Sequence, residues 1–140
     1  MTDIKPDFSG EWRLNRGACT LSPGADGVRS AVWHIDHRDP KFRIKASCET
    51  ASDPIQWEYE LLSDGVEVVG GEPGASMTSR VHWDGDALVV TMRIERPGGE
   101  MTIEFRHQLL DDGRRLRADE QLRGTDHDQD NVWMFERRQG

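Results

Sequence analysis

Long apolar runs and clustered basic residues are both scarce in this chain of 140 residues. No stretch approaches the roughly 20 consecutive apolar residues that a membrane-spanning helix needs. The formal net charge of −8 disfavours nucleic acid and anionic membranes as partners, because both are bound by clustered lysine and arginine. We therefore expect no membrane partner and no nucleic-acid partner.

Cysteine is scarce as well, since Cys19 and Cys48 are the only two. So few cysteines are typical of a compartment in which thiols stay reduced. The first eight residues, MTDIKPDF, also lack the apolar run of a secretory signal peptide. These observations predict a cytoplasmic protein with two free thiols, and a Cys19–Cys48 disulfide is the alternative.

A convincing amphipathic helix is missing too, and strand patterns are present instead. Asp-Gly, Asp-Pro and Gly-Gly pairs recur at short intervals and favour tight turns. Between these pairs, apolar and polar residues alternate with a period of two, which is typical of half-buried strands. We expect a single domain over residues 1–140. The predicted strands span residues 8–15, 30–38, 41–49, 55–62, 66–69, 77–83, 87–96, 100–109, 114–122 and 131–138.

Short connections make strands that are neighbours in the sequence antiparallel neighbours in the sheet. A meander with one apolar face has two unpaired edges, and closing it into an up-and-down barrel removes them. We therefore predict an all-β fold, an antiparallel up-and-down β-barrel of about ten strands, wide enough to hold a ligand. A curved open sheet or a sandwich is the alternative.

Two tight turns predict the register of the strands that they join. One turn places Trp83 opposite Leu88, and the other places His107 opposite Ala118. All four residues fall on the apolar face. We expect them to form one layer of the interior, around a cavity with an aromatic wall and one polar side chain.

The segment FSGEWRLN, residues 8–15, has a glycine two residues before a tryptophan. In a closed meander this first strand pairs with the last one, NVWMFERR. We expect Gly10 to let the strands approach closely and Trp12 to plug one end of the barrel, with the Arg137 guanidinium over the indole. The alternative is an ordinary core tryptophan and a solvated Arg137.

These segments together resemble the calycin superfamily, which includes the lipocalins and the fatty-acid-binding proteins. More closely, the chain resembles a group of small bacterial lipocalin-like proteins, which share the F-S-G-x-W start, an I-x-H-x-D-P segment (residues 35–40), D-G-x-E (64–67) and W-D-G-D-x-L-V-V (83–90). The resemblance implies a barrel that holds a small apolar molecule. Two features of fatty-acid-binding proteins are missing. Residues 16–30 are too few for a two-helix lid, and the Arg and Tyr that hold a fatty-acid carboxylate have no clear counterparts.

Several polar side chains share the apolar face. His107 and Glu120 are diagonal neighbours on adjacent strands, and in an apolar cavity they could orient a ligand or act as general acid and base. A structural ion pair is the alternative. Tyr59, the only tyrosine, could donate a hydrogen bond to a ligand or fill the core. The predicted ligand-binding residues are Trp33, Tyr59, Trp83, Leu88, Val90, Phe105, His107 and Glu120.

The leading functional hypothesis is the binding of a small apolar or aromatic molecule inside the barrel, by a monomer or homodimer. An enzyme of the same fold is the alternative, an isomerase, cyclase or hydrolase that uses His107 and Glu120. A haem-binding barrel and a partner-binding scaffold are further alternatives. We expect no cofactor and no metal. His34 and His37 have opposite parity in a strand, and the acidic segment at residues 126–131 lacks the glycine of a calcium loop.

Overall fold

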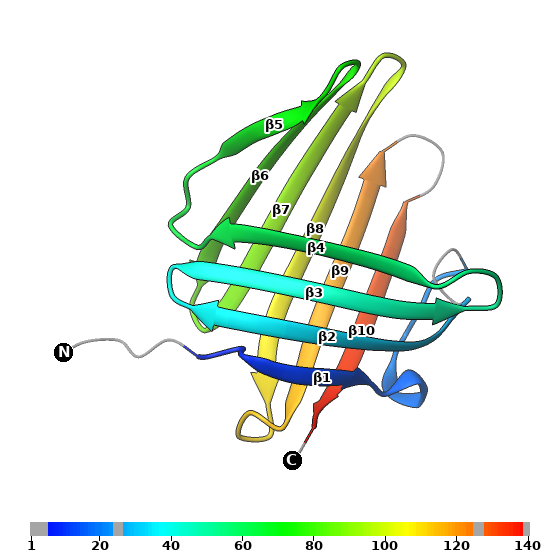
Figure 1. Cartoon of the computed structure of the whole chain (residues 1–140), viewed down its shortest axis with the longest axis vertical. Coiled ribbons are helices and arrows are strands. Elements are labelled where there is room, and N and C mark those ends of the chain that lie inside the picture. The colour runs from blue at the N-terminus through cyan, green and yellow to red at the C-terminus, as the bar shows by residue number, and fades with distance from the viewer. Residues whose placement is uncertain (1–5, 24–26, 125–127, 139–140) are drawn as a thin grey trace.

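The structure, a computed structural model, describes residues 6–23, 27–124 and 128–138. Ten antiparallel strands form one curled sheet (Figure 1). Its strands are β1 (Gly10–Leu14), β2 (Val28–Arg38), β3 (Lys41–Thr50), β4 (Ile55–Leu62), β5 (Val68–Glu72), β6 (Ala75–Asp84), β7 (Ala87–Arg96), β8 (Gly99–Leu110), β9 (Arg115–Gly124) and β10 (Gln129–Arg137). A short 3-10 helix, η1 (Arg16–Ala18), follows β1. Asp126 of the acidic segment lies outside the described residues.

The strand order is β4-β3-β2-β1-β10-β9-β8-β7-β6-β5, a meander joined through its first and last strands. Both predicted registers are confirmed, with Trp83 opposite Leu88 and His107 opposite Ala118. The all-β, up-and-down fold is therefore confirmed. In the described part of the chain, no helix has the length and apolar character needed to cross a membrane.

The barrel is not closed by hydrogen bonds all the way round, so the prediction of complete closure was wrong at one junction. β4 and β5 end the strand order, and within residues 6–23, 27–124 and 128–138 no ladder joins them. The connection between them bonds elsewhere. The Ser63 N–H donates to the Pro40 carbonyl oxygen, and the Gly65 N–H donates to the Val81 carbonyl oxygen of β6. These bonds lead the chain away from β4 before β5 begins.

The inward side chains of the sheet form one apolar core. All five tryptophans belong to this core or pack against it, as the alternation predicts. The core stands between the two halves of the curled sheet, where β1–β4 cross over β6–β10 in Figure 1. Its largest fully buried apolar side chains are Trp12, Phe8, Phe42, Phe135 and Ile44.

The junction of β1 and β10 contains the predicted contact between Trp12 and Arg137. These residues are opposite each other in the register, and the guanidinium carbon Cζ lies 4.3 Å from the centre of the indole ring. Gly10 has a φ of 140°, and a Cβ atom there would lie 2.7 Å from Nη1 of Arg137. The glycine therefore makes room for the arginine side chain, rather than for a second backbone as expected.

Candidate functional site

An apolar cavity of about 180 Å³ lies inside the sheet, between β2–β4 on one side and β8–β10 on the other. Half of its lining residues are aromatic, and one carries a charge. The walls are apolar because each strand contributes the inward-facing residues of its alternation. The lining residues are Val28, Ala31, Trp33, Cys48, Ile55, Trp57, Phe105, Glu120, Trp133 and Phe135.

The aromatic wall is built around Trp33. Its ring centre lies 4.2 Å from that of Phe135, 5.8 Å from that of Trp57 and 6.3 Å from that of Phe105. Trp57 in turn stacks on Tyr59, with ring centres 5.5 Å apart and planes 7° apart. These offset and edge-to-face contacts favour one arrangement of the rings, so the wall is pre-formed.

Glu120 is the only charged residue among those that line the cavity. Its Oε1 accepts hydrogen bonds from Asn131 Nδ2 at 2.9 Å and from Trp133 Nε1 at 3.0 Å. Asn131 is buried, and its Oδ1 accepts from the backbone N–H and the hydroxyl of Ser22 at 2.8 and 2.9 Å. The carboxylate is thus held in place by β10 and by the segment that follows η1.

His107 lies behind the wall of the cavity, packed against Phe105 with ring centres 5.9 Å apart. Its Nδ1 is 3.0 Å from the Leu88 carbonyl oxygen, which requires Nδ1 to donate. Burial lowers the pKa of His107 to about 4, against the smaller opposing effect of the Leu88 carbonyl, so the imidazole is neutral at pH 7. Among the hydrogen bonds of the described residues, none joins His107 to Glu120. Their role as an acid–base pair stays a prediction.

The layer that was expected to surround the cavity is filled with side chains. Leu88 and Ala118 are fully buried. Phe8, which precedes β1, stacks on Trp83 with ring centres 6.1 Å apart and lies 6.3 Å from the His107 ring centre. The predicted position of the cavity was wrong because Phe8, from outside the strand pattern, enters this layer. The cavity lies farther along the barrel.

The structure brings three of the predicted ligand-binding residues to the cavity, namely Trp33, Phe105 and Glu120. The other five lie in the core or behind the wall, and these are Tyr59, Trp83, Leu88, Val90 and His107. Sequence reasoning did not assign Trp57, Trp133 and Phe135 to the cavity. Their inward parity was visible in the sequence, but parity does not tell how far along the barrel a residue lies.

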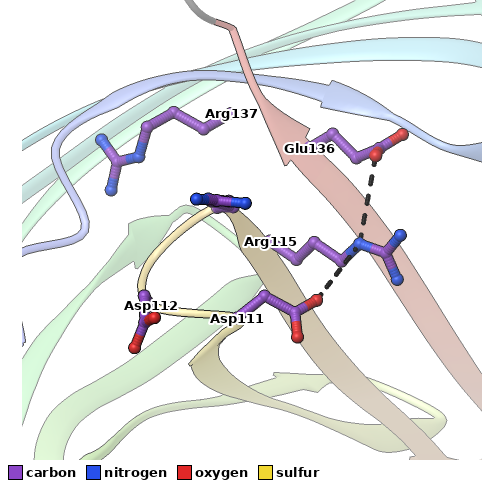
Figure 2. Close-up of a pocket in the computed structure, with 6 residues that line it drawn as sticks. Asp111, Asp112, Arg115, Glu136 and Arg137 are labelled. Carbon is purple, nitrogen blue, oxygen red and sulfur yellow. Dashed lines mark ion pairs between the residues drawn. The ribbon is translucent and has the colours of Figure 1, made fainter.

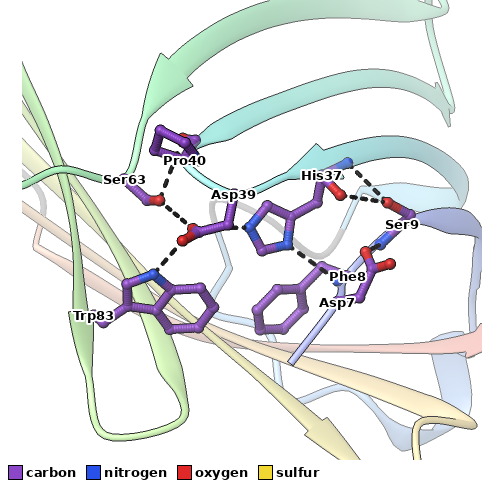
Figure 3. Close-up of polar contacts among 8 residues, drawn as sticks. All are labelled: Asp7, Phe8, Ser9, His37, Asp39, Pro40, Ser63 and Trp83. Carbon is purple, nitrogen blue, oxygen red and sulfur yellow. Dashed lines mark hydrogen bonds and ion pairs between the residues drawn. The ribbon is translucent and has the colours of Figure 1, made fainter. Parts of the chain in front are cut away.

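A polar cluster closes the barrel at the other end of β2 (Figure 3). His37 is buried, and its Nδ1 accepts the Phe8 N–H at 3.3 Å while its Nε2 lies 3.4 Å from Asp39 Oδ1. The same carboxylate oxygen accepts hydrogen bonds from Trp83 Nε1 at 3.1 Å and from the Ser63 hydroxyl. Burial raises the pKa of Asp39, but the bonds from Ser63, Trp83 and His37 lower it more, so the net pKa is below its ordinary value.

This cluster joins four separate segments: the residues before β1, the β2–β3 turn, the chain after β4 and the end of β6. Its histidine and aspartate were visible in the I-x-H-x-D-P segment at residues 35–40, although sequence reasoning gave them no role. The polar atoms described above bond to one another. We therefore assign the cluster to stabilising the closed end of the barrel.

A larger recess lies on the surface beside the β8–β9 turn (Figure 2). Arg115 Nε is 3.4 Å from Asp111 Oδ2 and 4.0 Å from Glu136 Oε1. Acidic and basic side chains occur there in equal number, and Arg115 pairs with two of the acidic ones, so the recess presents no charge of one sign to a ligand. Its lining residues are Asp111, Asp112, Arg114, Arg115, Glu136 and Arg137.

Cys19 and Cys48 are free cysteines, as predicted. Burial raises the pKa of the Cys48 thiol, so at neutral pH it faces the cavity as an uncharged apolar group. Within the described ranges, no group of three or more His, Cys, Asp or Glu side chains could hold a metal ion.

Several solved structures share this fold over nearly their whole length. The fluorescent protein UnaG, in a mutant form, is 20% identical, with 95% of this chain and 97% of that chain covered and a TM-score of 0.57. A secretory abundant heat soluble (SAHS) protein from Ramazzottius varieornatus is 10% identical, with 98% of this chain and 100% of that chain covered and a TM-score of 0.60. Secretory abundant heat soluble protein 4 from the same organism is 11% identical, with 99% and 100% covered and a TM-score of 0.56.

The chain has the antiparallel β-barrel fold of these proteins. At these identities the likeness shows the fold alone. No family model matches the sequence, and no curated protein matches it either. The evidence for the function of this barrel therefore comes from the cavity itself.

Proposed function

We propose that this protein binds a small apolar or aromatic molecule in the cavity lined by Trp33, Trp57, Phe105, Trp133 and Glu120. One observation carries the proposal, namely a space of about 180 Å³ between the two halves of the sheet with apolar walls and a single oriented polar group. A mostly apolar cavity with a few convergent polar groups is typical of a ligand site.

The aromatic side chains supply most of the contact area, and Glu120 fixes the orientation of the ligand. The resemblance to calycins supports the same function, because it implies a barrel that holds a small apolar molecule. Catalysis by His107 and Glu120 stays a prediction, since the hydrogen bonds of both side chains go to other groups. Binding needs no such pair.

A blocking substitution tests the proposal. Cys48 lines the cavity, whereas its neighbour Ser47 points to the exposed face of the same strand. The fluorescence of a neutral apolar probe, N-phenyl-1-naphthylamine, is titrated against the wild-type protein, Cys48→Phe and Ser47→Phe. We expect saturable binding to the wild type, about a tenfold or greater loss of affinity in Cys48→Phe because the phenyl ring occupies the cavity, and no change in Ser47→Phe.

Urea unfolding of both variants shows whether they fold. The proposal is wrong if the wild-type protein shows no saturable binding, or if Ser47→Phe weakens binding as much as Cys48→Phe does. Native mass spectrometry of the protein purified from its own host then identifies the molecule that it carries.

A further inference from the structure

We infer that the ligand is an organic cation, an apolar or aromatic molecule whose ammonium group is held by Glu120. The inference rests on the proposed function, because it concerns the same cavity. It distinguishes this barrel from one that holds the carboxylate of a fatty acid.

The charge of the cavity favours a cation. Of its ten lining residues, Glu120 carries a negative charge and none is basic. A ligand carboxylate would therefore enter an apolar space that holds a like charge and no opposite one, which is costly. The net charge of −8 also attracts cations to the protein as a whole.

The hydrogen bonds of Glu120 favour a ligand that donates. Its Oε1 already accepts from Asn131 and Trp133, so these two N–H groups are not available to a ligand. The described residues place no hydrogen-bond donor on Oε2. A carboxylate can only accept, and its bonds to charged donors are among the strongest in proteins. Oε2 is not among the buried atoms without a partner, so it is accessible, and an ammonium N–H can bind it in place of water.

The aromatic wall favours a cation as well. Trp33, Trp57 and Trp133 line the same space as the carboxylate, and tryptophan is the side chain whose ring face attracts cations most strongly. Trp133 donates to Glu120 through Nε1, which places the carboxylate at the edge of that indole. The ring face for an ammonium group bound to Glu120 therefore has to come from Trp33 or Trp57.

Three probes of similar shape separate the effect of charge from that of apolar contact. They are 2-naphthylmethylamine, which is a cation at neutral pH, the neutral alcohol 2-naphthylmethanol and the anion 2-naphthoate. Calorimetric titrations at 150 mM salt compare the wild type with Glu120→Gln, in which an amide oxygen can still accept from Asn131 and Trp133. Glu60→Gln is the matched control, since Glu60 is exposed on the outer face of β4 and its loss changes the net charge equally.

We expect the amine to bind the wild-type protein about tenfold or more tightly than the alcohol, and the naphthoate to bind weakest. Glu120→Gln should abolish the preference for the amine while the affinity for the alcohol changes less than about threefold, and Glu60→Gln should keep the preference. In Trp57→Leu, which keeps an apolar wall, the amine should lose more affinity than the alcohol.

Other outcomes overturn the inference. Equal binding of amine and alcohol, tightest binding of naphthoate, or equal loss of the preference in Glu60→Gln and Glu120→Gln would each show that Glu120 does not select a cation. All three leave the proposed function intact, because a probe still binds in the cavity. If no probe binds, the proposed function fails and the inference fails with it.

Discussion

Replacing Gly10 by alanine tests how the first strand of the barrel is joined to the last. The φ of 140° at Gly10 is rarely adopted by residues with a side chain, and holding one there costs on the order of 1–3 kcal/mol. The new Cβ would also lie 2.7 Å from Nη1 and 3.6 Å from Cζ of Arg137. The guanidinium must therefore move.

Moving Arg137 disturbs three contacts. Its Nε donates to the Gly113 carbonyl oxygen at 2.9 Å, its Nη1 donates to the Ser9 carbonyl oxygen, and Cζ lies over the Trp12 ring. The contact with the ring contributes about 0.5–2 kcal/mol and each hydrogen bond about 1 kcal/mol. Since the half-buried side chain can regain bonds to water, only part of this is lost. Together with the backbone strain, we expect Gly10→Ala to lower the free energy of unfolding by about 2–4 kcal/mol.

Urea unfolding followed by tryptophan fluorescence measures this loss. Arg137→Met and the double mutant complete a cycle, in which alanine should cost about 1 kcal/mol less once the arginine is absent. Gly27→Ala is the control, because among the described residues, apart from its chain neighbours, no atom lies within 4 Å of a Cβ there, and its φ is not in the positive range. A loss below about 1 kcal/mol for Gly10→Ala would refute the strain, and additive effects in the cycle would refute the part assigned to Arg137.

Two further predictions concern the buried His107 and the hydrogen bond from Trp83 to Asp39. His107 has a pKa of about 4 in the fold against an ordinary 6.5, so its contribution to stability is fully present above pH 6.5 and is lost as the pH falls toward 4. When the pH falls from 7 to 5, the free energy of unfolding measured in urea should therefore decrease by about 2 kcal/mol more for the wild type than for His107→Gln. Equal decreases would contradict a buried, neutral imidazole. Trp83→Phe keeps a ring against Phe8 but removes the donor to Asp39. It should lower the free energy of unfolding by about 1 kcal/mol and raise the pKa of Asp39 in an NMR titration, and an unchanged pKa would show that the indole N–H does not hold the carboxylate.

The alternation of apolar and polar residues was sufficient to predict ten strands and their order, because each strand buries one face. The alternation gave wrong strand bounds where a strand does not bury one face. β5 contains Gly70 and Gly71, and its Val69 is 72% exposed. In this strand an apolar residue is therefore not necessarily a buried one. The strand was expected at residues 66–69 and lies at Val68–Glu72. The open junction with β4 follows from hydrogen bonds of the connecting segment, which carry no periodic signal.

The candidate site could be predicted only in part, because the alternation tells which face of the sheet a side chain is on but not which part of the barrel is filled. Parity placed Trp33, Phe105 and Glu120 on the inner face, which is correct. Whether a given depth of the barrel is filled depends on side chains that arrive from outside the strands, and Phe8 is one of these. The partners of Glu120 also come from a neighbouring strand, so they depend on a register that no short turn in the sequence specifies.

The unpaired junction between β4 and β5 determines which wall of the cavity can move most easily. β4 contributes Ile55 and Trp57 to the lining, and in the described part of the chain its only ladder is with β3. On its free side, an outward shift of β4 breaks side-chain contacts but no backbone ladder. At this wall β4 is therefore held by a backbone ladder on one side and by packing on the other, whereas β8, β9 and β10 in the opposite wall have ladders on both sides. If the cavity binds a ligand as proposed, a larger molecule should be accommodated on the β4 side.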